Sequence, residues 1–172
     1  MKAELTSSVA REELLILYNT VVQAANPLVQ KYDGFIDKYL TEGLMVLFYG
    51  TAEKTIDCII NITQLIKKFN IHRQEQSLPP IHIASGVHYG KLMMGTIGED
   101  ERMDTTVISD VVNISSRMHS YATEKNVHII ISETVRTQLP ESYWRTHSCF
   151  YHGKIQFHGK KNLTNVYEVD LL

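Results

Sequence analysis

The first third of the chain places a hairpin pattern between two helical patterns. Apolar residues recur every three or four positions across 8–32 and again across 52–69, which is typical of amphipathic helices. Between them, short apolar runs at 35–40 and 44–49 are separated only by 41–43 and predict an antiparallel β-hairpin, with its turn glycine in the left-handed conformation. Because helices and strands with one apolar face must bury it, we expect helices packed on a sheet.

The rest of the chain alternates strand and helix patterns. Strand patterns lie at 81–88, 91–97, 105–108, 127–131, 154–157 and 165–169, and helical patterns lie at 110–122 and directly after Ser132. We expect 91–97 to pair back on 81–88 through a turn at Gly90. Asp110 is the expected cap of the helix that it begins. The alternation predicts an α/β or α+β fold around one mixed sheet, in a single domain of residues 1–172.

The composition is that of an ordinary soluble globular protein. Hydrophobic residues make up 44% and charged residues 21% of the 172 residues, and the formal net charge is -2. Neither nucleic acid nor an anionic membrane is favoured by such a balanced charge, and no run of about 18 apolar residues predicts a membrane span. Residues 1–10 lack the apolar core of a signal peptide, and Cys58 and Cys149 are isolated. We therefore expect a cytoplasmic segment without nucleic-acid or membrane contacts.

Several short motifs follow one another along the chain. Residues 34–45 have the sequence GFIDKYLTEGLM, 86–90 GVHYG, 95–98 GTIG, 102–113 RMDTTVISDVVN, 158–160 HGK and 166–169 VYEV. In this order they resemble GGFIDKxxGDGVM, GIHTG, GNIG, RMDYTVIGDTVN and LKGK…VYEV of the class III nucleotidyl cyclase catalytic domain, found in adenylyl and guanylyl cyclases. Arg117 follows the fourth motif at the family's spacing. The resemblance extends from about Glu12 to the end of the chain.

The resemblance implies a fold and a reaction. The fold is an α+β sandwich with a ferredoxin-like mixed sheet, on which helices pack. The reaction is attack of the ribose 3′-oxygen on the α-phosphate of a nucleoside triphosphate, which releases pyrophosphate and a cyclic nucleotide. Family members use Mg²⁺ or Mn²⁺ and build each active site between two domains, so a homodimer or heterodimer is implied.

The same resemblance assigns substrate contacts residue by residue. Lys38 matches the lysine that recognises the purine, and Thr106 matches its partner position. A lysine ammonium only donates hydrogen bonds and therefore suits the N1 acceptor of adenine, so ATP is favoured over GTP. Asn113 matches the residue that orients the ribose, Arg117 the residue that binds the reacting phosphate, and Lys160 the lysine at the distal phosphates.

The metal half of the site is incomplete in this sequence. The family holds two ions with two aspartates. The first lies in a strand before the first helix, and this chain does not contain that strand. The second belongs to the hairpin turn, where this chain has Thr41 and Glu42. Glutamate keeps the charge but adds a methylene, whereas Mg²⁺ demands near-ideal octahedral geometry. We expect carboxylates from outside this chain, and little turnover by the chain alone.

Several alternatives stay open at this point. Glu42 is either a metal ligand or only a turn residue, and Lys154 or Lys161 would serve as well as Lys160. The strand that the family places first could come from preceding residues or from another chain, or the sheet could be rearranged. Three hypotheses of function follow: a complete adenylyl cyclase domain, a degenerate half that completes a partner's site, and an inactive pseudo-cyclase that binds nucleotide or dimerises.

Overall fold

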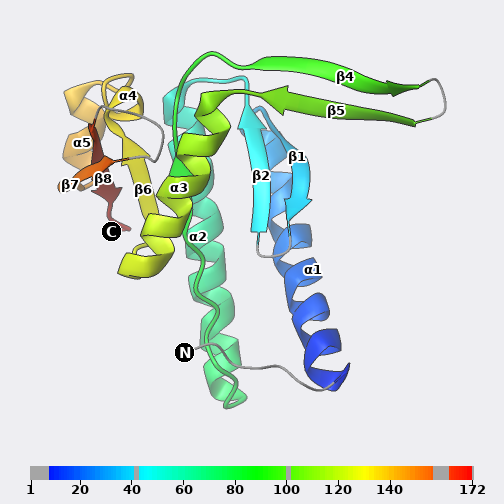
Figure 1. Cartoon of the computed structure of the whole chain (residues 1–172). Coiled ribbons are helices and arrows are strands. Elements are labelled where there is room, and N and C mark those ends of the chain that lie inside the picture. Colours follow the sequence, from blue (N-terminus) through cyan, green and yellow to red (C-terminus); the bar gives the residue numbers. More distant parts are fainter. Residues whose placement is uncertain (1–7, 41–42, 100–101, 157–162, 172) are drawn as a thin grey trace. The chain divides into compact units, whose positions relative to one another are not determined.

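The computed structural model describes residues 8–40, 43–99, 102–156 and 163–171, which form helices and strands of an α+β protein (Figure 1). The chain divides into two compact units, Met1–Lys68 and Phe69–Leu172, and each is described by itself. No helix in the described ranges is long and apolar enough to cross a membrane.

The first unit contains the predicted hairpin and helical segments. Its elements are α1 (Ser8–Lys31), β1 (Gly34–Leu40), β2 (Gly43–Phe48) and most of α2 (Ala52–Glu75). Strands β1 and β2 pair antiparallel, from Gly34 opposite Phe48 to Leu40 opposite Gly43. The predicted left-handed Gly43 is therefore wrong, because this glycine is a paired strand residue whose φ is not positive. The hydroxyl of Tyr18 on α1 donates a hydrogen bond of 2.9 Å to the Gly43 carbonyl and ties the hairpin to the helix.

The second unit is built around a four-stranded sheet. Its elements are β3 (Ser85–Val87), β4 (Met93–Glu99), β5 (Arg102–Ile108), α3 (Asp110–Lys125), β6 (Ile129–Ser132), α4 (Glu133–Arg136), α5 (Glu141–Thr146), β7 (Cys149–Gln156) and β8 (Leu163–Val169). The sheet order is β3-β6-β8-β7, with β3 parallel to β6 and the other pairs antiparallel. Helix α3 packs on β3 and β6. This mixed sheet with its helix confirms the predicted α+β class.

The apolar core of the second unit lies between α3 and the sheet. Its buried members are Ile114, Met118, Ala122, Val127, Ile130 and Val166. Three of them recur at every fourth position of α3, and this spacing is what gives the helix one apolar face. The opposite face of α3 is left for polar side chains.

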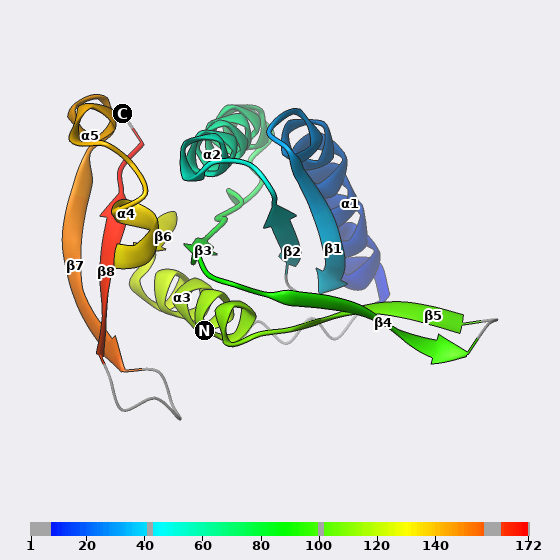
Figure 2. The ribbon, with the colours of Figure 1, turned by 90° about the horizontal axis from the view of Figure 1, so that it is seen from above.

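Strand pairing differs from the sequence prediction in two respects. Strand β4 pairs with β5, from Met93 opposite Ile108 to Glu99 opposite Arg102, and not with the segment before Gly90. The single predicted sheet is divided among three groups of described strands, because the hairpins β1–β2 and β4–β5 each pair internally. Within the second unit, the β4–β5 hairpin extends away from α3 and the four-stranded sheet (Figures 1 and 2).

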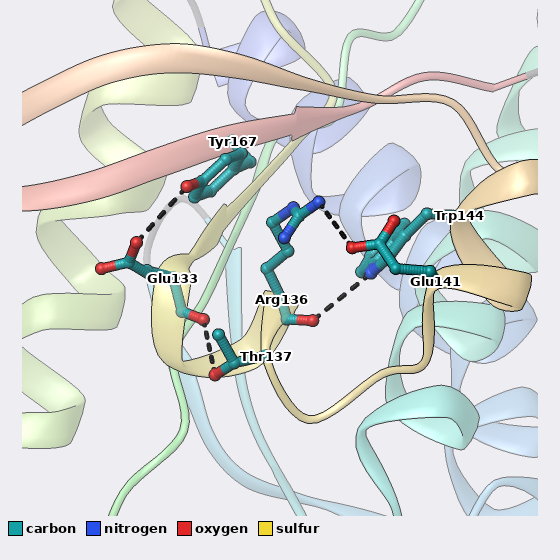
Figure 3. Close-up of polar contacts among 6 residues, drawn as sticks. All are labelled: Glu133, Arg136, Thr137, Glu141, Trp144 and Tyr167. Atoms are coloured by element: carbon teal, nitrogen blue, oxygen red, sulfur yellow. Dashed lines mark hydrogen bonds and ion pairs between the residues drawn. The ribbon is translucent and has the colours of Figure 1, made fainter.

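Polar contacts join the short helix α4 to β8 and to α5 (Figure 3). Glu133 accepts a hydrogen bond of 3.5 Å from the Tyr167 hydroxyl, and Arg136 pairs with Glu141 at 3.1 Å. The indole nitrogen of Trp144 donates to the Arg136 carbonyl at 3.3 Å. These contacts join neighbouring elements of one unit and include none of the predicted site residues, so we assign them a structural role.

Candidate active site

Helix α3 carries two of the predicted site residues, Asn113 and Arg117. They lie at positions i and i+4, so they share one face of the helix, and both are exposed. The buried residues Ile114 and Met118 directly follow them and lie about 100° around the helix. The helix therefore presents an amide and a guanidinium to solvent, one turn apart.

The beginning of α3 is fixed by a serine cap. Ser109 has extended backbone dihedrals, and its hydroxyl accepts a hydrogen bond of 3.1 Å from the Val111 amide. The same hydroxyl donates to the Lys91 carbonyl at 3.0 Å, which ties the helix start to the segment before β4. The prediction that Asp110 caps this helix is wrong, because Asp110 is already its first helical residue.

A glycine allows α3 to lie directly on β3. A Cβ atom at Gly86 would come within 2.3 Å of the His119 backbone nitrogen and 2.4 Å of the Ser115 carbonyl oxygen. The Ser115 hydroxyl donates a hydrogen bond of 2.6 Å to the Gly86 carbonyl across this contact. Close packing and one hydrogen bond thus fix how near α3, the helix that carries Asn113 and Arg117, lies to β3.

Thr106 and the α3 pair belong to one continuous segment. Thr106 lies on β5 opposite Gly95, and β5 leads through Ser109 into α3. The second unit therefore supplies three of the predicted substrate contacts from consecutive elements.

Lys38 lies in the first unit, on β1, and its side chain is 45% exposed. Its Nζ atom is 3.6 Å from Oδ2 of Asp37, whose side chain is only 2% exposed. The structure places Asn113 and Arg117 on one helix of the second unit, whereas Lys38 belongs to the first unit, which is described by itself. Glu42 and Lys160 lie outside the described residues.

The described residues do not fit a divalent metal site. No group of three or more His, Cys, Asp or Glu side chains converges in those ranges. Asp37, the carboxylate next to Lys38 on the hairpin, is buried beside an ammonium group, and a cation is disfavoured at such a place. Asp37 stands directly before Lys38 within the first motif, although the resemblance assigned it no role.

The comparisons with known proteins agree on one family. The model of the adenylate and guanylate cyclase catalytic domain matches residues 13–169. An adenylate cyclase of Anabaena cylindrica is 32% identical over 91% of this chain and 32% of its own length. The chain spans about a third or less of the length of the curated relatives it matches.

Solved structures show the same fold. The adenylyl cyclase CyaB of P. aeruginosa superposes with a TM-score of 0.77 at 24% identity, over 97% of this chain and 85% of that one. The guanylyl cyclase Cya2 superposes with a TM-score of 0.76 at 21% identity, over 92% of this chain and 81% of that one. The fold alone therefore does not distinguish adenine from guanine substrates. Because the family model matches residues 13–169, this chain belongs to the adenylate and guanylate cyclase catalytic domain family.

Proposed function

We propose that this chain forms the nucleotide-recognition and charge-stabilising half of a cyclase site that converts ATP to cyclic AMP and pyrophosphate. The observation that carries the proposal is the exposed pair on α3. Asn113 and Arg117 lie one turn apart at the positions that the family motif gives to ribose and phosphate contacts. The serine cap and the close contact at Gly86 hold their helix in place, as a site that orients substrate requires.

Arg117 supplies the charge that this reaction needs. When the ribose 3′-oxygen attacks, a new bond forms to the α-phosphorus, the bond to the bridging oxygen breaks, and pyrophosphate leaves. Negative charge grows on the α-phosphate during this step, and a guanidinium offers it a fixed fork of donors. The amide of Asn113 both donates and accepts hydrogen bonds and therefore suits the ribose. We assign the distal phosphates to Lys160.

The base is assigned to Lys38 and Thr106. The ammonium of Lys38 donates to N1 of adenine, and the hydroxyl of Thr106 accepts from the 6-amino group. Guanine carries a donor at N1, which is mismatched with the Lys38 ammonium, whereas the Thr106 hydroxyl can donate to the guanine O6, so Lys38 carries the discrimination. Adenine nucleotides are the substrates that this pair of residues favours.

The metal carboxylates are assigned to a partner domain. The family is generally metal-dependent, while the described part of this chain offers no convergent set of ligands. Catalytic domains of this family act as dimers. The projecting β4–β5 hairpin supports such a pairing, because its Met93 and Met94 side chains are 77% and 41% exposed. The partner is a second cyclase domain that carries the aspartates.

The test is a complementation assay for cyclic AMP. The chain alone with Mg-ATP should give little or no product. Mixing it with a related cyclase subunit that has intact metal aspartates, but a disabled Asn/Arg pair, should restore activity at one interface site. Strong Mg-dependent turnover by the chain alone would contradict this division of labour. A stable heterodimer without activity would assign the chain to the pseudo-cyclases, which keep the fold for binding or dimerisation.

Base selectivity is a separate prediction that needs no turnover. ATP analogues should bind about 5–150-fold more tightly than GTP analogues, because each unpaired polar group in a buried contact costs about 1–3 kcal/mol. Isothermal titration calorimetry on wild type and Lys38→Ala measures the preference and its loss. Lys54→Ala, which removes another exposed lysine of the same unit, is the matched control. Equal affinities in wild type would mean that Lys38 does not read the base.

A further inference from the structure

Strand β1 contains an irregularity directly beside Lys38. Ile36 pairs with Val46 and Lys38 pairs with Met45, which are consecutive on β2, so Asp37 is an extra residue without a partner in the ladder. This is a β-bulge. In a regular strand, neighbouring side chains point to opposite faces, and the charged groups of adjacent residues are kept apart. At this bulge the Asp37 carboxylate and the Lys38 ammonium lie 3.6 Å apart.

The Asp37 carboxylate is in an unusual state for a charged group. Its side chain is 2% exposed, and Oδ2 has no hydrogen-bond donor among the residues that the structure describes. A buried carboxylate oxygen without a donor is unfavourable, so a positive group nearby is strongly attracted. Lys38 Nζ supplies that charge at 3.6 Å, an ion-pair distance that is longer than the roughly 2.8 Å typical of a charge-assisted hydrogen bond. Asp37 is too deeply buried to meet a nucleotide directly, whereas Lys38 is 45% exposed.

We propose that Asp37 is a positioning residue for Lys38: the bulge in β1 sets its buried carboxylate beside the ammonium and thereby holds that ammonium where it meets the purine. The proposal rests on the proposed base-reading role of Lys38. A lysine side chain has four rotatable bonds, and ordering it when a ligand binds lowers affinity. A fixed negative charge beside the ammonium restricts it before the nucleotide arrives. Asp37 therefore contributes to adenine preference without touching the base.

The first experiment is a double-mutant cycle in nucleotide binding. Asp37→Asn keeps the shape of the side chain and removes its charge. It should weaken binding of an ATP analogue by about fivefold, leave binding of a GTP analogue unchanged, and have no further effect in a Lys38→Ala background. Equal weakening of both nucleotides, or additive effects of the two substitutions, would overturn the proposal, since a merely structural role would produce either result.

The chain offers a matched control for the loss of one negative charge. Asp33 lies in the same unit and pairs with Lys54 at 2.6 Å, with both side chains about half exposed. Its φ of 60° is a value that Asn adopts readily, so Asp33→Asn should fold normally. This substitution breaks an exposed ion pair that does not include Lys38 and should leave nucleotide selectivity unchanged.

A second experiment separates this proposal from the proposed function. The ¹⁵Nζ resonance of Lys38 and the hydrogen exchange of its ammonium can be followed by NMR in the nucleotide-free protein. Asp37→Asn should shift the resonance and speed the exchange, whereas Asp33→Asn should do neither. If the pairing is seen but wild type does not prefer ATP, the base-reading role fails and the pairing stands. An unchanged resonance would refute the pairing itself.

The pairing can also be tested in wild type if Asp37→Asn does not fold. Titration of the Asp37 carboxyl carbon should produce an inflection at the same pH in the Lys38 ¹⁵Nζ resonance. The Lys54 resonance should not follow the Asp37 inflection. Independent titration of Asp37 and Lys38 would overturn the proposal.

Discussion

Arg117→Ala should lower kcat of the complemented enzyme by roughly 10²–10³-fold, the loss expected when a donor to developing charge is removed. The effect should fall on kcat more than on KM, because the guanidinium meets charge that grows in the transition state. Arg117 is exposed on α3 and makes no part of the apolar core, so the fold should be retained. Steady-state measurement of cyclic AMP formation, with ATP varied, gives both constants.

Two further variants define what the arginine does. Arg117→Lys should keep part of the activity, since it retains the charge but not the planar fork. Ser116→Ala changes the exposed residue next to Arg117 on the same helix. It should leave kcat within about twofold, because substitutions at exposed positions outside a binding site rarely have large effects. Activity that is indifferent to Arg117→Ala would remove this residue from the site and favour a pseudo-cyclase.

Gly86→Ala should destabilise the second unit by about 3 kcal/mol, the upper end of the usual cost of overpacking. The added Cβ would meet backbone atoms of α3 at 2.3, 2.4 and 2.7 Å, and backbone cannot move aside as a flexible side chain can. The helix must therefore lift from β3, which would also displace Asn113 and Arg117. Urea unfolding reports the loss, followed by the fluorescence of Trp144, the single tryptophan, which lies in this unit.

Gly95→Ala is the matched control for this substitution. Gly95 lies on β4 of the same unit, and a Cβ there would meet nothing within 4 Å. Its urea midpoint should stay close to that of wild type. An equal and small effect of both substitutions would show that α3 does not need its close approach to β3.

The elements that the sequence predicted well have a strong local signal. The periodicity of 110–122 predicted helix α3, whereas Asn113 and Arg117, which the periodicity alone does not single out, were predicted from the family motif. The predicted cap at Asp110 was wrong by one residue, since the side chains of Ser109 and Asp110 can both accept from a helical amide. Helix α5 was not predicted from the sequence; Pro140 stands at its N-cap, where no amide hydrogen is needed.

Tertiary pairing was less accessible from sequence. Gly90 suggested that the strand after it turns back on β3, but the long hairpin β4–β5 pairs its own two strands over seven residue pairs. Local hairpin contacts of this kind require the least chain entropy to form. The bulge at Asp37 could not be predicted for another reason. The apolar run at 35–40 does not show which of its residues is left unpaired in the hairpin. Asp37 therefore entered the site only through its distance to Lys38.

The bulge also decides which side of the hairpin carries the lysine. Residues that pair across two strands point to the same face, and neighbours along a strand point to opposite faces. Because Ile36 is opposite Val46 and Lys38 is opposite Met45, these two β1 residues face opposite ways, whereas uninterrupted alternation would put them on the same side. Pairing Asp37 in register, so that β1 had no bulge, would turn the ammonium to the other face of the hairpin. Every motif residue would keep its identity, and the base contact would still be lost, so the register of this strand carries as much information as its composition.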